Sequence, residues 1–81
     1  MTISELAGAL REVTLTLERA RSTATNAVPL LAESRATLTA ASKDTNGYEP
    51  VELDFAMAQL TTAGELISLA RQALLDYLLR L

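Results

Sequence analysis

Apolar residues recur with heptad spacing along the first half of the chain. One series occupies every seventh position, and a second series follows each of its members by three residues. The first series is Ile3, Leu10, Leu17, Ala24, Leu31 and Leu38, and the second is Leu6, Val13, Ala20, Ala27, Ser34 and Ala41. Eleven of these twelve residues are apolar. Because such a stripe is typical of a helix packed on another helix, we predict a helix over about residues 2–42.

The ends and the middle of this first helix carry further signals. Thr2 and Glu5 have the spacing of a capping box, which places the helix start at Thr2. Pro29 argues against a continuous helix, because proline lacks an N–H and clashes with the preceding turn. The heptad keeps its phase across Pro29, so we expect a kinked but continuous helix. The alternative is a break near residues 25–28, with Asn26 as a new cap.

A polar segment over residues 43–49 predicts a turn. Gly47 adopts positive backbone angles cheaply and can end the first helix. Pro50 suits the first position of a second helix, and Glu52 and Asp54 would place negative charge at its positive end.

A second apolar series predicts a helix over about residues 50–81, with leucine or isoleucine at every seventh position from Leu53 to Leu81. A short turn makes the two helices antiparallel neighbours. We therefore expect residues 1–81 to form one all-α domain, an antiparallel two-helix hairpin that dimerises into a four-helix bundle. The expected hairpin core consists of Leu6, Leu10, Val13, Leu17, Leu31, Leu38, Leu53, Leu60, Ile67, Leu74 and Leu78.

The second helix carries more apolar surface than one neighbouring helix can cover. Its flanking leucines extend beyond the stripe that faces the first helix. An exposed apolar patch of this length marks an interaction surface. The residues expected to contact a second chain are Leu66, Leu69, Leu75, Leu79 and Tyr77.

The composition argues against catalysis and metal binding. The chain has no histidine and no cysteine, so the commonest general base and the commonest zinc ligands are missing. Lys43 could activate a serine only from within a pocket, and it falls in the predicted turn. The acidic cluster around that turn departs from a calcium loop, because its glycine comes two residues early and Phe55 occupies the closing-glutamate position. We expect no enzymatic activity, no cofactor and no small-molecule substrate.

The charge pattern limits the classes of partner. The net charge is −3, and arginines are interleaved with glutamates along the first helix. This pattern does not predict the basic surface that nucleic-acid binding needs. No apolar stretch reaches the length of about 18 residues that a membrane span needs. A charged leader followed by an apolar core is absent from the N-terminus, so we expect a cytoplasmic protein, or one exported without a cleaved signal peptide.

The layout resembles the small helical-hairpin proteins exported by type VII (ESX) secretion systems of actinobacteria, and the helical N-terminal segments of actinobacterial secreted toxins. The resemblance consists of long helices rich in alanine and leucine, a polar central turn, and the ending Tyr77-Leu78-Leu79-Arg80-Leu81. It implies dimeric helical bundles. Two family motifs differ: the turn reads Thr45-Asn46-Gly47-Tyr48-Glu49 in place of Trp-x-Gly, and Leu81 replaces the acid expected four residues after the tyrosine.

Two classes of function fit these expectations. The first is a non-enzymatic module that pairs with itself or with a related helical protein, and a secretion-associated hairpin protein is one form of it. The alternative is a small adaptor, antitoxin or chaperone-like regulator that covers an apolar groove of its partner. A self-sufficient bundle would be a folded dimer alone, whereas an adaptor would fold only on its partner.

Overall fold

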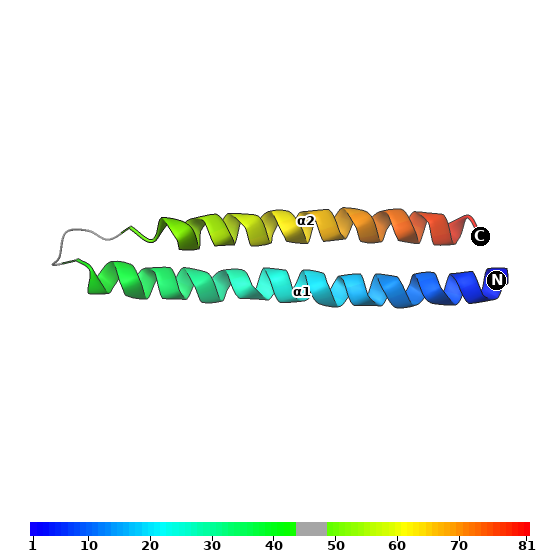
Figure 1. The fold of residues 1–81 in the computed structure, drawn as a ribbon, viewed down its shortest axis with the longest axis horizontal. Coiled ribbons are helices and arrows are strands. Elements are labelled where there is room, and N and C mark those ends of the chain that lie inside the picture. Colours follow the sequence, from blue (N-terminus) through cyan, green and yellow to red (C-terminus); the bar gives the residue numbers. More distant parts are fainter. Residues whose placement is uncertain (44–48) are drawn as a thin grey trace.

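The computed structural model, which describes residues 1–43 and 49–81, consists of two long helices. Helix α1 spans Ile3–Ala41 and helix α2 spans Val51–Leu79. The helices run antiparallel and lie side by side, with both chain termini at the same end of a rod 65 Å long (Figure 1). The predicted all-α two-helix hairpin is confirmed. Most of the predicted turn, including Gly47, lies outside the described residues.

Helix α1 starts at the predicted cap. The Thr2 side chain accepts a hydrogen bond from the Glu5 backbone N–H at 3.0 Å, which satisfies one of the free donors at the helix start. Pro29 lies inside α1 and is exposed, and the helix continues beyond it to Ala41. The chain is therefore helical through residues 25–28, where a break was the alternative.

Helix α2 begins one residue later than expected. Pro50 is buried and precedes the helix as its cap residue, without a side-chain hydrogen bond. Glu52 and Asp54 occupy the first turn, where their negative charges interact favourably with the positive end of the helix dipole.

Three contacts between the helices define their register. Glu18 faces Arg71, Thr25 lies beside Gly64, and Arg35 pairs with Asp54. From one contact to the next, the residue number in α1 rises by as much as the residue number in α2 falls. The beginning of α1 therefore extends past the end of α2, as Figure 1 shows at the termini.

The seam of α1 uses the first heptad series and a different second series. The residues that face α2 follow the first series by four positions rather than three, and all of them are buried or half-buried: Ala7, Thr14, Arg21, Val28, Arg35 and Ser42. Thr14 is the most enclosed of these, at 6% exposure, and its hydroxyl donates a hydrogen bond to the Arg11 carbonyl at 2.8 Å. The arginines fit because their stems pack while their charged heads stay near solvent.

The core of the hairpin is thin. Ala24, Thr14 and Gly64 are buried within the two helices. Most of the expected core residues are half-buried: Leu6, Leu10, Leu17, Leu31, Leu53, Leu60, Ile67, Leu74 and Leu78. Val13 and Leu38 differ from that expectation, with exposures of 46% and 40%. Val13 belongs to the series that turns away from α2, and the register sets Leu38 opposite Val51, where α2 is only beginning.

Candidate protein-interaction surface

Ion pairs mark one long face of the hairpin, which we call the charged face and define by Glu18, Arg21, Arg35, Asp54 and Arg71. Two of its three ion pairs, Arg35–Asp54 and Glu18–Arg71, join α1 to α2. The flanks of the two helices that carry these side chains must therefore lie on the same side of the hairpin.

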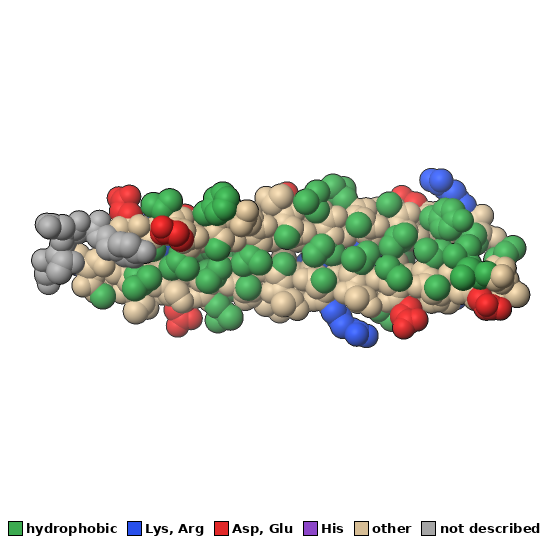
Figure 2. Space-filling view, viewed as in Figure 1, with side chains coloured by type: hydrophobic (Ala, Val, Ile, Leu, Met, Phe, Trp, Pro, Cys, Tyr) green, Lys and Arg blue, Asp and Glu red, His purple; other side chains and the backbone are tan. Residues whose placement is uncertain are grey.

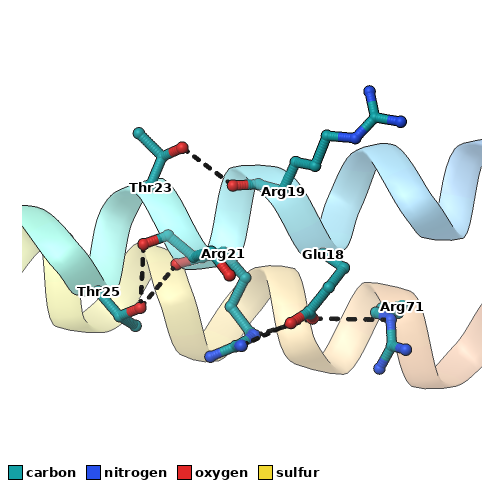
Figure 3. Close-up of polar contacts among 7 residues, drawn as sticks. Glu18, Arg19, Arg21, Thr23, Thr25 and Arg71 are labelled. Carbon is teal, nitrogen blue, oxygen red and sulfur yellow. Dashed lines mark hydrogen bonds and ion pairs between the residues drawn. The ribbon is translucent and has the colours of Figure 1, made fainter.

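Glu18 is the centre of one charged cluster (Figure 3). Its carboxylate accepts hydrogen bonds from Nε and Nη2 of Arg21, at 2.9 and 2.6 Å, and its Oε2 lies 3.8 Å from Nε of Arg71. The hydrogen bonds from Arg21, and then the charges of Arg21 and Arg71, hold the pKa of Glu18 below its ordinary value. The same pairing raises the pKa of Arg21.

Arg35 and Asp54 form a second pair, closer to the turn. Arg35 donates two hydrogen bonds to the Asp54 carboxylate, from Nε at 2.5 Å and from Nη2 at 3.3 Å. This bidentate pairing raises the pKa of Arg35. The two side chains are 40% and 47% exposed, so solvent screens the pair and its contribution to stability is small.

The opposite face has a different composition, and we call it the uncharged face. A helical residue three positions after another lies about 60° to one side of it, whereas the residue four positions after lies about 40° to the other side. The second heptad series of α1 therefore points away from the charged face. In α2, the residues three positions after each member of the series that starts at Leu53 point the same way. The uncharged face consists of Leu6, Val13, Ala20, Ala27, Ser34 and Ala41 from α1 and Ala56, Ala63, Ala70 and Tyr77 from α2.

Hydrophobic side chains line the groove between the helices on one side of the rod, while charged side chains lie at its margins (Figure 2). Residues of the uncharged face remain accessible: Val13 and Tyr77 are 46% and 45% exposed, and Ala20 and Ala70 are also exposed. Leu6, Ala27, Ala56 and Ala63 are half-buried, so the hairpin covers part of this face and leaves the rest of an apolar series with heptad spacing exposed.

The residues expected at an interface do not share one direction. Leu66, Leu69 and Leu79 are exposed, by 60%, 67% and 86%, whereas Leu75 is half-buried. Leu66 and Leu75 are separated by two and a half helical turns, so they point to opposite sides of α2. Leu66 adjoins the uncharged face, which includes Tyr77.

An open groove of about 690 Å³ lies on the charged face beside Gly64. A Cβ at Gly64 would come within 3.4 Å of Thr25 Cγ2, so the missing side chain allows close approach of the two helices. Among residues 1–43 and 49–81, no group of three or more acidic, histidine or cysteine side chains could hold a metal ion. The hydroxyls of Thr25 and Thr61 in this groove donate to carbonyls of their own helices, those of Arg21 and Met57, at 3.1 and 3.0 Å.

None of the described helices combines the length and hydropathy needed to cross a membrane. Comparisons with protein-family models, with curated proteins and with solved structures found no match.

Proposed function

We propose that this chain is a non-enzymatic protein-interaction module that packs an apolar helix face against another helical protein. The observation that carries the proposal is the apolar surface left uncovered on a two-helix rod. Exposed side chains such as Phe55, Leu66 and Leu69 are 60% or more accessible, and the core holds few buried residues. Exposed apolar surface of this extent supports a protein partner.

The shape favours a helical partner. A rod 65 Å long with apolar side chains along the groove between its helices offers a stripe that another long helix or hairpin can follow (Figure 2). A secretion-associated hairpin is one form of such a module, supported by the two-helix layout alone. An adaptor that covers an apolar groove of its partner would use the same surface.

In-cell photo-crosslinking tests this proposal. A photo-reactive amino acid would replace Leu66, which adjoins the uncharged face. The full chain carrying it would be expressed in the cells that naturally produce this protein. The matched control replaces Leu15, a leucine of similar exposure (61%) on the other helix. We expect a crosslinked product from position 66, containing a second protein chain, and little or none from position 15. Absence of any product from position 66, or equal products from both positions, would overturn the proposal.

A further inference from the structure

We infer that the uncharged face is the docking surface of this module and that its occupant is a second copy of the same chain. This inference rests on the proposed function and names the partner and the face. The four α2 residues of that face repeat every seven positions, as the α1 series does, and both series lie on the same side of the hairpin, so the two helices present one surface to a neighbour.

The exposed surface area of the hairpin is large enough for an interface with a second copy of the chain. The chain exposes 6025 Å², whereas a compact monomer of 8.7 kDa exposes about 4,700 Å². The excess exceeds the ~800 Å² per partner that a stable interface of standard size buries. Pairing two hairpins along their length removes surface of this order from water and supplies the core that each lacks.

The charge distribution favours a second copy on the uncharged face. A two-fold dimer brings the same patch of both chains together, so the patch must be complementary to itself. The uncharged face has nine apolar residues and one serine, so its copy meets no like charge on it. A copy docked on the charged face would have to remove charged side chains of Glu18, Arg21, Arg35, Asp54 and Arg71 from water.

Four hydroxyl groups of α1 that lie on or beside the uncharged face already donate a hydrogen bond within the helix. Thr16, Thr23 and Thr37 each donate to the carbonyl four residues earlier, at 3.0–3.1 Å, and Ser34 does the same. Burial of a hydroxyl is costly mainly when its hydrogen bonds are lost. These side chains can therefore enter an interface without leaving an unpaired donor.

Sedimentation equilibrium of the full chain and three glutamate variants tests the inference. Ala20→Glu and Ala70→Glu place a charge on the uncharged face at positions exposed in the hairpin, so the hairpin itself tolerates them. Ala36→Glu makes the same change at an exposed alanine outside that face. We expect the parent and Ala36→Glu to sediment as dimers. The dissociation constants of Ala20→Glu and Ala70→Glu should rise at least tenfold, with helix content by circular dichroism unchanged.

Two results would overturn the inference. Dimers of Ala20→Glu and Ala70→Glu as tight as the parent dimer would show that another face is used. A parent that stays monomeric at high concentration would remove the second copy as occupant. The proposed function fails separately, through the crosslinking experiment: a product joining position 66 to a different protein would leave that function standing even with a monomeric parent.

Discussion

Glu18 on α1 and Arg71 on α2 face each other across the hairpin at 3.8 Å, but no hydrogen bond joins them. The Arg71 Nε atom is shielded from solvent and has no hydrogen-bond partner. The Glu18 carboxylate instead accepts both of its strong hydrogen bonds from Arg21, on its own helix. This cluster therefore stabilises α1 locally and contributes less to holding the two helices together.

The lowered pKa of Glu18 predicts a dependence of stability on pH. Because the folded-state pKa lies below the ordinary 4.5, the charged form of Glu18 stabilises the folded chain above that pH, and the contribution is lost as the pH falls through the folded value. We expect the parent to melt at a higher temperature than Glu18→Gln near neutral pH, and the difference to shrink in acid. Thermal melts of the parent and of Glu18→Gln, from neutral pH down into acid, measure the difference in melting temperature. A difference that does not change with pH would contradict the assignment.

Replacement of Arg71 by methionine tests whether the cross-helix ion pair matters for stability. Methionine keeps much of the packed stem and removes the Nε donor, which is shielded from solvent, and a shielded donor without a partner costs free energy. We expect Arg71→Met to melt at or above the temperature of the parent. A large decrease in melting temperature would show that the pair with Glu18 holds the helices in register.

Truncation of seam leucines tests the packing of the hairpin. Leu17 and Leu60 are half-buried, so Leu17→Ala and Leu60→Ala should each cost about 2 kcal/mol, the lower end of the range for such changes. Leu15→Ala is the control, since Leu15 is 61% exposed and should change stability by no more than about 0.5 kcal/mol. Urea unfolding of the three variants measures these costs. Equal effects at positions 15 and 17 would disprove the seam.

Pro29→Ala tests the continuity of α1. Proline is the poorest residue inside a helix, and alanine would restore a donor for the carbonyl of Thr25. We expect the free energy of unfolding to rise by about 1–3 kcal/mol, with helix content unchanged or higher. Thermal melts followed by circular dichroism measure both quantities. A loss of stability would show that the chain depends on the rigidity of proline at this position.

Local signals predicted the elements of the fold well. The heptad that runs through Pro29 indicated one long helix, and Thr2 with Glu5 indicated its start. Both signals involve residues within one or two helical turns of each other, where sequence spacing translates directly into geometry.

The sequence did not predict which side of α1 faces α2. The more apolar series, with Val13 and Ala20, was expected in the seam, yet the series with Thr14 and Arg35 occupies it. The choice depends on partners such as Asp54 on the other helix, and a single helix does not reveal them. In the dimer that we infer, the apolar series outside this seam packs against the second copy, so the heptad pattern of α1 would serve two neighbours.

Intermolecular contacts between alanine methyl groups test the central claim, that two copies meet through their uncharged faces. The measurement is an isotope-filtered nuclear Overhauser experiment on an equal mixture of ¹³C-labelled and unlabelled chains. We predict intermolecular signals at the methyls of Ala20, Ala63 and Ala70, and none at Ala36. Signals at Ala36 without signals at Ala20 and Ala70, or a complete absence of intermolecular signals, would contradict the claim.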